Sequence, residues 1–415
     1  MLDINYIREN KKLVEETAKN KNRVIDVEPI IKLDDERKQL IQKSQTLREE
    51  RNVLAKQGNT EEGRTRGKEL KDELKGLEDR LRDVEIELHD KMSYVPNVTL
   101  PEVPVGKDET GNQQMKTWGT PRTFDFPVKD HMELGEALDL IDTKRGSKVS
   151  GFRGYYLKNQ AAQLEFAILF YVFNKLAAKG YTPVIAPSVV KGFTLFGSAH
   201  FPWGKKDDVY QTDEDTFLSG TAEIPVTAYH SDEVLTEKDL PKKFVALSPC
   251  YRKEAGSYGK DTKGILRVHE FWKIEQVILC PADMEKAREL HQELQENCEE
   301  ILQDLELPYE VLLMCTGDMG EPQMLKYDAQ VWFPSQNMYR ESGSNSIMGD
   351  FQARRLNIRY KDAQGETKFV YTLNNTAISM RPLLAIMENN QQADGSITIP
   401  KALQPLVGFD TIKAL

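Results

Sequence analysis

The sequence has few cysteines and lacks the glycine-rich signatures of the common nucleotide-binding folds. Its cysteines, at 250, 280, 298 and 315, lie far apart, with no CxxC pair and no neighbouring pair of histidines to build a zinc site. We expect them to be buried thiols. Neither a Walker A loop nor a GxGxxG fingerprint occurs, so a nucleotide would have to be held by side chains on a sheet.

Membrane and targeting signals are also lacking. No uninterrupted apolar run approaches the roughly 20 residues that a membrane-spanning helix needs. The first residues, MLDINYIRENKKLVEE, contain acids at once and no apolar signal segment. We therefore expect a cytoplasmic protein with no membrane partner. The net charge of −10 argues against coating of DNA or RNA by bulk electrostatics, but RNA recognised by shape from one limited surface stays open.

Residues 30 to 92 carry the clearest periodicity, which is that of a coiled coil. Between its two halves lies KQGNTEEGRTRG, whose three glycines predict a reversal and hence an antiparallel helical hairpin. About 25 residues per helix would give an arm on the order of 35 to 40 Å long. The periodic positions are Leu33, Leu40, Leu47 and Leu54, then Leu70, Leu74, Leu77, Leu81, Val84 and Leu88.

The role of this arm stays open on its own pattern. Its basic and acidic residues are mixed, so a dimerisation or scaffold coiled coil is one reading. A basic cluster near the tip is where phosphates would be contacted, although a solvated face explains it almost as well. The cluster comprises Arg48, Arg51, Lys56, Arg64, Arg66, Lys68 and Lys71.

The rest of the chain reads as a linker followed by an α+β domain. Residues 94 to 127 are rich in proline, glycine and short polar residues. From residue 128, strands outnumber crossover helices, which favours a largely antiparallel sheet. Residues 159 to 180 predict a helix apolar on most faces, buried in the core or against a second subunit. Other expected elements are helices at 283–306 and 377–390, and strands near 182–187, 309–315, 327–333, 353–360 and 367–374.

Residues 251 to 275, YRKEAGSYGKDTKGILRVHEFWKIE, concentrate charged side chains around glycines at 256, 259 and 264. They predict strand, long loop, strand, with Arg267, His269 and Glu275 on one face of the second strand. Arg252 would end the first strand, where its planar guanidinium could bind a phosphate bidentately. An ordinary hairpin with its charges in water remains the alternative.

This segment resembles motif 2 of the seryl-tRNA synthetases, which are class II aminoacyl-tRNA synthetases. Lys260 and Glu270 stand where that family commonly has arginine and glutamine. Two further segments are similar to the same family, in the same order: YRESGSNSIMGDFQARR at 339–355 and TLNNTAISMRPLLAIMEN at 372–389, its motif 3. LSGTAEIPV at 218–226 resembles its serine-binding loop, and the helix at 159–180 corresponds to its dimer-forming motif 1.

The resemblance implies a serine–tRNA ligase that uses ATP and Mg²⁺, acts on L-serine and tRNA(Ser), with tRNA(Sec) as an additional candidate, and forms a homodimer. It implies a tRNA-binding helical domain at 1–100 with its arm at 28–92, a linker at 101–127 and a catalytic domain at 128–415. The implied catalytic residues are Arg252, Glu275 and Arg381. Serine would contact Thr221, Ala222, Glu223, Arg252, Glu275 and Thr376. ATP would contact Arg252, Lys253, Glu254, Val268, His269, Glu270, Phe271, Glu341, Ser342, Gly343, Ser344 and Arg381, with Mg²⁺ at Glu341 and Ser344.

Two rival functions remain at this point. A synthetase-like ligase that charges a carrier protein would share the catalytic segments, but such relatives lack the long arm. A non-catalytic coiled-coil adaptor derived from a synthetase would be expected to lose catalytic side chains early. The chain retains Arg252, Glu254, Glu275, Glu341 and Arg381, which favours the enzyme.

Overall fold

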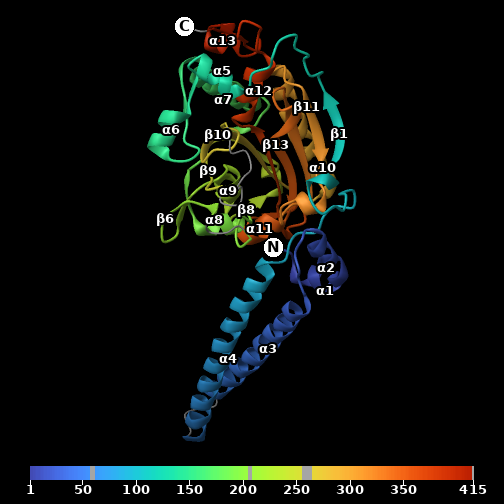
Figure 1. Cartoon of the computed structure of the whole chain (residues 1–415). Helices are drawn as coiled ribbons and strands as arrows, with labels where there is room; N and C mark the ends of the chain where they lie inside the picture. Colours follow the sequence, from blue (N-terminus) through green and yellow to red (C-terminus); the bar gives the residue numbers. More distant parts are fainter. Residues whose placement is uncertain (57–60, 204–207, 255–263, 414–415) are drawn as a thin grey trace. The chain divides into compact units, whose positions relative to one another are not determined.

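The structure is a computed structural model that describes residues 1–56, 61–203, 208–254 and 264–413 (Figure 1). The chain divides into two compact units, Met1–Val98 and Thr99–Leu415. Each unit has its own buried side chains.

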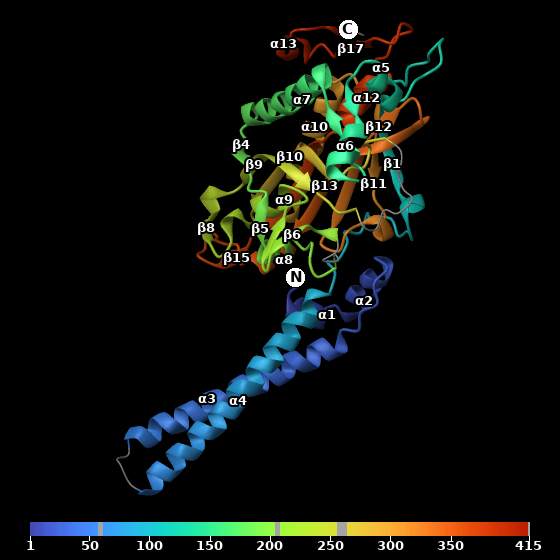
Figure 2. The ribbon, with the colours of Figure 1, turned by 60° about the vertical axis from the view of Figure 1, so that its left-hand side comes forward.

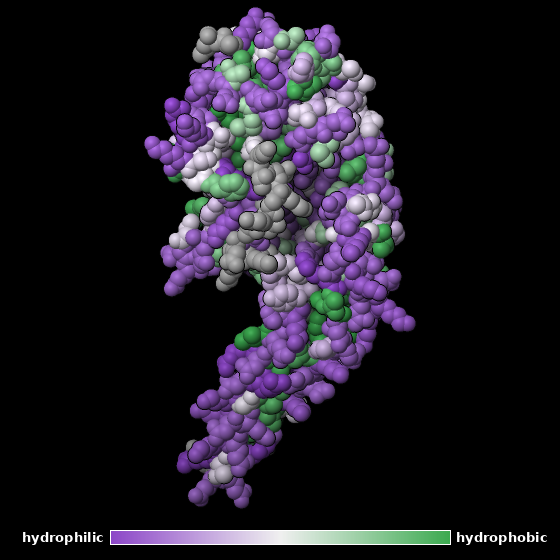
Figure 3. Space-filling view, viewed as in Figure 1, coloured by the Kyte–Doolittle hydropathy of each residue, from purple (hydrophilic) through white to green (hydrophobic). Residues whose placement is uncertain are grey.

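Unit 1 is helical, with α1 (Ile4–Glu9), α2 (Lys11–Asn20), α3 (Glu28–Lys56) and α4 (Glu61–Ser93). The long helices α3 and α4 pack along each other as the expected hairpin (Figure 2). Leu40, Leu70 and Leu88 of the periodic positions are buried, while most polar positions face water (Figure 3). Burial of this apolar seam, rather than intrinsic helix propensity, is what holds two long helices together.

The reversal of the hairpin is shorter than the glycines predict. Gly63 and Gly67 lie inside α4, and Gly58 falls outside the described residues. Two basic residues of the tip cluster are paired across the hairpin, Arg48 with Glu78 and Arg66 with Glu50. These pairs are exposed to water, so they add little to stability and could be exchanged for a contact with phosphate.

Unit 2 is built on an eight-stranded sheet in the order β1-β11-β12-β13-β16-β10-β9-β4. All neighbouring strands are antiparallel except β4 and β9, which confirms the expected α+β class with an antiparallel sheet. The strands are β1 (Gln113–Trp118), β4 (Thr182–Ile185), β9 (Lys242–Tyr251), β10 (Glu270–Cys280), β11 (Tyr309–Leu313), β12 (Leu325–Phe333), β13 (Met338–Gly349) and β16 (Tyr371–Ile378).

The main helices pack against this sheet and enclose its core. Helix α10 contacts β10, β13 and β16, and α7 contacts β9, β10 and β16. Apolar residues of α7, α10 and α12 share one buried cluster with the central strands. The helices of unit 2 are α5 (His131–Ala137), α6 (Thr143–Ser150), α7 (Asn159–Ala178), α8 (Gly192–Gly197), α9 (Glu223–Thr227), α10 (Met284–Asp304), α11 (Phe351–Leu356), α12 (Arg381–Asn389) and α13 (Gln404–Val407).

Smaller sheets complete the unit. They are β15-β14-β8, β5-β7-β6, β2-β3 and β17-β18. Their strands are β2 (Ile141–Asp142), β3 (Tyr156–Leu157), β5 (Val189–Lys191), β6 (Gln211–Asp213), β7 (Thr216–Leu218), β8 (Val234–Thr236), β14 (Arg359–Lys361), β15 (Thr367–Phe369), β17 (Ile397–Thr398) and β18 (Thr411–Ile412).

Helix α7 is the one helix among the described residues that is long and apolar enough to cross a bilayer by length and composition. In that respect it departs from the expectation that no apolar run is long enough. Leu164, Ile168 and Val172 are buried in the core cluster of unit 2. The opposite side carries Phe166 and Phe170, which are 65% and 60% exposed. The helix is therefore a core element with an uncovered aromatic face.

The prediction of a strand at 353–360 is wrong. Residues Phe351–Leu356 form α11, and only Arg359–Lys361 form a strand. The Arg354 side chain pairs with Asp350 one turn earlier at 2.8 Å, and Asn357 ends the helix in the left-handed conformation at φ 55°. An (i, i+4) ion pair and an asparagine at the helix end are both typical of a short helix.

Candidate functional site

Arg252 is positioned by the paired strands β9 and β10. Tyr251, the last residue of β9, lies opposite Glu270, the first residue of β10. The Arg252 Nε donates a hydrogen bond to the Gly220 carbonyl at 3.2 Å, and its guanidinium carbon lies 5.2 Å from the centroid of the Phe271 ring. Most of the expected glycine loop between the strands, residues 255–263 with Lys260, lies outside the described residues, while Gly264 at its end is described with φ 77°.

The second strand begins later than the alternation predicts. Arg267 and His269 precede β10, so the prediction that they share a strand face with Glu275 is wrong. The His269 Nδ1 lies 2.9 Å from the carbonyl oxygen of Arg252, and Arg267 reaches back to Glu254, with 2.7 Å from Nη1 to Oε2. Glu254 itself has φ 56°, an uncommon conformation for a residue other than glycine. Tertiary contacts, rather than strand pairing, fix this stretch.

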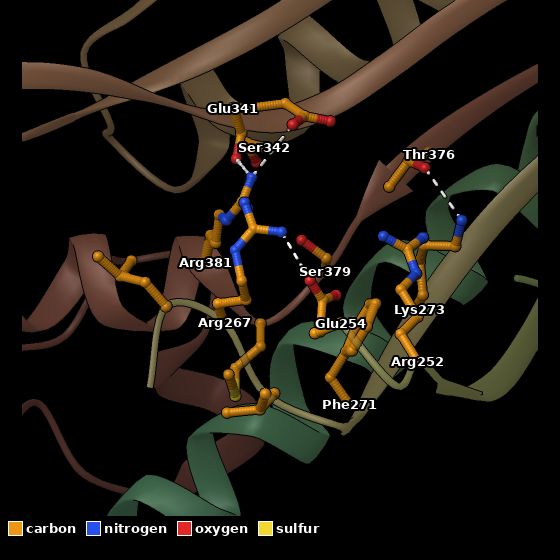
Figure 4. Close-up of a pocket in the computed structure, with 13 residues that line it drawn as sticks. Arg252, Glu254, Arg267, Phe271, Lys273, Glu341, Ser342, Thr376, Ser379 and Arg381 are labelled. Carbon is orange, nitrogen blue, oxygen red and sulfur yellow. Dashed lines mark hydrogen bonds and ion pairs between the residues drawn. The ribbon is translucent and has the colours of Figure 1, made fainter. Parts of the chain in front are cut away.

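A cavity of about 620 Å³, including space open to solvent, lies where the three separated segments meet (Figure 4). Arg267, Arg381, Glu254 and Glu341 gather at one side of it, and Arg252 and Lys273 lie together at the other. The full lining is Arg252, Glu254, Leu266, Arg267, Val268, Phe271, Lys273, Glu341, Ser342, Thr376, Ser379, Met380 and Arg381.

Eight of the residues expected from the sequence line this cavity: Arg252, Glu254, Val268, Phe271, Glu341, Ser342, Thr376 and Arg381. The other expected residues are not part of its lining. They are Thr221, Ala222, Glu223, Lys253, His269, Glu270, Glu275, Gly343 and Ser344. The cavity therefore brings together Arg252 and Arg381, the residues expected to contact phosphate, while most of the residues expected to contact serine lie outside its lining.

That deeper layer is assembled by alternation along β10 and β16. Lys273 and Glu275 point to the cavity side of β10, and Glu275 lies opposite Thr376 of β16. The Thr376 hydroxyl donates to Glu275 Oε2 at 3.0 Å. Burial raises the pKa of Glu275, the ammonium of Lys273 opposes that rise, and the carboxylate of Glu223 adds to it.

The Thr221–Glu223 segment lies against the same layer. The Glu223 amide donates to Thr221 Oγ1 at 3.2 Å, which turns the start of α9. Glu223 Oε1 accepts hydrogen bonds at 2.9 Å from both Gln352 and Asn374. Burial raises the pKa of Glu223, and the hydrogen bond from Gln352 opposes that rise. Two hydrogen bonds therefore fix the position of the Glu223 carboxylate near the cavity floor.

Strand β13 and helix α12 form the opposite wall. Arg381 is the first residue of α12, and Pro382 follows within the first turn, where proline is tolerated. The Arg381 Nη1 donates to the Glu341 carbonyl and lies 3.5 Å from Glu341 Oε2. Gly343 packs so closely that an added Cβ would lie 2.8 Å from the Thr376 carbonyl oxygen. Glycine is therefore needed at 343 for steric reasons.

Sequence reasoning missed four polar or flexible lining residues of the cavity: Arg267, Lys273, Ser379 and Met380. For Lys273 a signal was available, because it stands two residues before Glu275 on the same strand. A lone lysine in a charged strand is usually solvated, so the pattern alone does not predict that Lys273 belongs to the site. Its burial depends on Thr376, which reaches it from a strand about a hundred residues later.

Comparisons with known proteins match segments along the whole chain to one family. The family model of the seryl-tRNA synthetase N-terminal domain matches residues 1–99, and that of the tRNA synthetase class II core domain (G, H, P, S and T) matches residues 207–390. A serine–tRNA ligase of Treponema denticola is 43% identical, with 99% of this chain and 100% of the relative covered. One of Deinococcus radiodurans is 42% identical, with 98% of each chain covered.

Solved structures give the same result. The seryl-tRNA synthetase of Pyrococcus horikoshii, solved with ATP, superposes with a TM-score of 0.94 at 38% identity over 100% of both chains. The cytoplasmic enzyme of Naegleria fowleri, solved with AMP, has a TM-score of 0.89 at 30% identity, covering 100% of this chain and 99% of that one. Both family models, full-length relatives and the shared fold lead to one conclusion: the chain belongs to the seryl-tRNA synthetase family of class II synthetases.

Proposed function

We propose that this protein joins L-serine to the 3′ end of tRNA(Ser), using ATP, with tRNA(Sec) as an additional candidate acceptor. The observation that carries the proposal is the meeting of Arg252, Glu341 and Arg381, from three separated segments, around one cavity. The full-length relatives named serine–tRNA ligases support the same reaction.

The first step requires positioning and charge neutralisation rather than a protein nucleophile. The serine carboxylate attacks the α-phosphorus of ATP, which forms seryl-adenylate and releases pyrophosphate. Arg252 would bind the α-phosphate and Arg381 the γ-phosphate, because guanidinium groups bind phosphate oxygens bidentately. Glu254 and Phe271, on the cavity wall, would hold the adenine. Fixed cations that neutralise developing charge without reorganising are an effective source of catalysis.

The second step transfers the seryl group. The terminal ribose hydroxyl of the tRNA attacks the acyl carbon of the adenylate, its proton leaves, and AMP departs with the bonding electrons. The cavity is open to solvent, so a single-stranded tRNA end could approach the adenylate from outside.

The residues at the β13 wall fit a magnesium ion carried by ATP. Glu341 and Ser344 supply a carboxylate and a hydroxyl oxygen, which Mg²⁺ accepts beside phosphates and water. The Glu341 side chain is 50% exposed, so it can turn to a ligand. Behind them, the buried Asp328 has an Oδ1 atom without a hydrogen-bond partner among the described residues. When bound, the ion would neutralise phosphate charge.

Serine would be selected by the layer beneath the cavity floor. Glu275 is our candidate acceptor for the serine hydroxyl, with Thr376 beside it. Thr221, Ala222 and Glu223 would contact the substrate serine, and the Glu223 carboxylate, which accepts hydrogen bonds from two amides, would accept from its ammonium group. A buried acceptor of this kind discriminates strongly against an amino acid without a hydroxyl.

The other partners follow from unit 1 and from α7. We assign tRNA binding to residues 1–100 with the arm at 28–92, a linker role to 101–127 and catalysis to 128–415. The exposed Phe166 and Phe170, one helical turn apart, would be covered by a second copy in a homodimer. We expect the protein to work in the cytoplasm with ATP and Mg²⁺, and to use neither DNA nor a membrane.

The test is amino-acid-dependent ATP–pyrophosphate exchange, followed by charging of tRNA. Serine should support exchange, while threonine, alanine and glycine should support little, and serine should then appear on tRNA(Ser). No exchange with any of the four amino acids would contradict the proposal and favour a non-catalytic adaptor. Exchange without charging of tRNA would favour a ligase for a carrier protein.

A further inference from the structure

The buried ammonium of Lys273 joins three residues of the serine layer. Its Nζ lies 2.5 Å from Glu275 Oε2, 2.6 Å from Thr221 Oγ1 and 3.2 Å from Thr376 Oγ1. Only 6% of the Lys273 side chain is exposed, although the residue belongs to the cavity lining. Lys273 therefore lies between the cavity and Glu275, where a substrate would meet it first.

The contacts of this ammonium account for all its hydrogen-bonding capacity. An ammonium group has three N–H donors, and here each has an oxygen acceptor. Lys273 thus has no donor to spare for serine or ATP in this arrangement. Its effect on a substrate has to pass through Thr221, Thr376 and Glu275, whose oxygen atoms it holds.

Lys273 also sets the direction of the neighbouring hydroxyl protons. Thr376 Oγ1 accepts from Lys273 and donates to Glu275, so its proton is committed. Thr221 Oγ1 accepts from Lys273 and from the Glu223 amide, so its own proton is available to a ligand oxygen. The contacts described for Glu275 fall on Oε2, which leaves Oε1 as the acceptor that a ligand can use.

We propose that Lys273 is a positioning residue for serine selection, which clamps Thr221, Thr376 and Glu275 into one hydrogen-bonded unit and leaves Glu275 Oε1 to accept from the substrate. The inference rests on the proposed function, because it needs serine as the ligand. A solvated or merely structural lysine would have no such effect on one substrate alone.

The surroundings give the sign of the expected pH effect. Burial raises the pKa of Glu275 and Lys273 is the main charge that opposes the rise. Without Lys273, that pKa moves further up, and serine recognition would be lost at a higher pH as the carboxylate takes up a proton. Other titratable or charged groups that interact with the pair are Glu223, Arg252, Cys250, Cys298 and His200.

The experiment compares Lys273→Met with the full-length wild type in serine-dependent ATP–pyrophosphate exchange between about pH 6 and 9. Methionine keeps the length of the chain but removes the charge and the donors. The matched control is Lys243→Met, which removes a partly buried lysine paired with Glu293 away from the cavity. Wild-type exchange with serine tests the proposed function separately from the role of Lys273.

We expect Lys273→Met to raise the KM for serine about 10- to 100-fold, the size expected for hydrogen bonds to a charged group, with the KM for ATP nearly unchanged. The acid limb of kcat/KM for serine should move to higher pH. The Lys243→Met variant should keep both the serine KM and the pH profile. An unchanged serine KM and profile in Lys273→Met would overturn the proposal, and so would a lower serine KM, which would mean that Lys273 competes with the substrate ammonium.

A second variant covers the case in which Lys273→Met folds poorly because Glu275 is left buried without its counterion. The double variant Lys273→Met/Glu275→Gln removes both charges of the pair. If Lys273 acts on the charge of Glu275, the double variant should lack the acid limb that moves in Lys273→Met, as Glu275→Gln alone does. An acid limb that still moves to higher pH in the double variant relative to Glu275→Gln would overturn this part of the proposal.

Discussion

Replacing Glu275 by glutamine separates the charge of this residue from its shape. The side chain is 2% exposed and pairs with Lys273 at 2.5 Å and Thr376 at 3.0 Å. Glutamine preserves the volume and one oxygen acceptor, so the cavity floor should keep its packing. What it removes is the negative charge that the serine hydroxyl would meet.

The expected magnitude follows from the loss of a charged acceptor in a buried site. Hydrogen bonds to charged groups contribute about 1.5–3 kcal/mol, so kcat/KM for serine should fall roughly 10- to 100-fold. Rejection of alanine, which can reach about 10⁴ or more for a buried polar acceptor, should fall with it. The KM for ATP should stay within about twofold of the wild-type value. An equal loss of affinity for serine and for ATP would indicate a structural effect instead.

Glu275→Ala is the informative contrast to Glu275→Gln. Both variants remove the counterion of Lys273, but alanine also removes the oxygen that accepts from its ammonium and leaves a cavity, which costs about 3–5 kcal/mol and should lower the Tm markedly. Serine-dependent exchange should be lost, while calorimetry should still detect ATP binding below the Tm. Near-normal serine exchange by either variant would refute the role of Glu275 in serine selection.

Three further substitutions test other parts of the site. Arg381→Gln should raise the KM for ATP in the exchange assay at least tenfold, because it removes a guanidinium at the cavity wall, and should leave serine discrimination intact; equal KM values would exclude it from phosphate binding. Gly343→Ala should lower the Tm by several degrees and reduce exchange, because its Cβ would lie 2.8 Å from the Thr376 carbonyl; full activity would show that the backbone gives way. Phe166→Glu should shift sedimentation from dimer toward monomer, since the ring is 65% exposed on α7; an unchanged dimer would place the interface elsewhere.

The arm could be predicted because its signal is local. A seven-residue spacing of leucines needs no distant partner, and α3 and α4 bury the expected seam. Glycine was the weak part of that prediction. Gly63 and Gly67 are accommodated within α4, since tertiary packing outweighs their low helix propensity.

The segments that form the site could be predicted from the sequence, but how deeply each side chain lies below the cavity surface could be predicted less well. Arg252 and Arg381 lie on the cavity wall as their motifs indicate, whereas Glu275 lies beneath it, screened by Lys273. Burial of a lysine depends on oxygen acceptors from other segments, here Thr221 and Thr376. The periodicity of a sequence indicates which face of a strand a residue occupies. It does not indicate which distant side chain forms hydrogen bonds with that residue.

The strand expected at 353–360 failed for a related reason. Gln352 is fully buried in α11, where it donates to Glu223 and accepts from Thr372. That helix is short, so its periodicity is too brief to distinguish from a strand. The position of α11 is set by the hydrogen bonds that Gln352 makes with Glu223 and Thr372.

The measurement that tests the central claim most directly is serine-dependent ATP–pyrophosphate exchange by the wild-type protein, carried through to charging of tRNA(Ser). The account predicts exchange with serine far above that with threonine, alanine or glycine, and serine esterified to tRNA(Ser). Exchange supported by another amino acid in preference to serine, or no exchange at all, would contradict it.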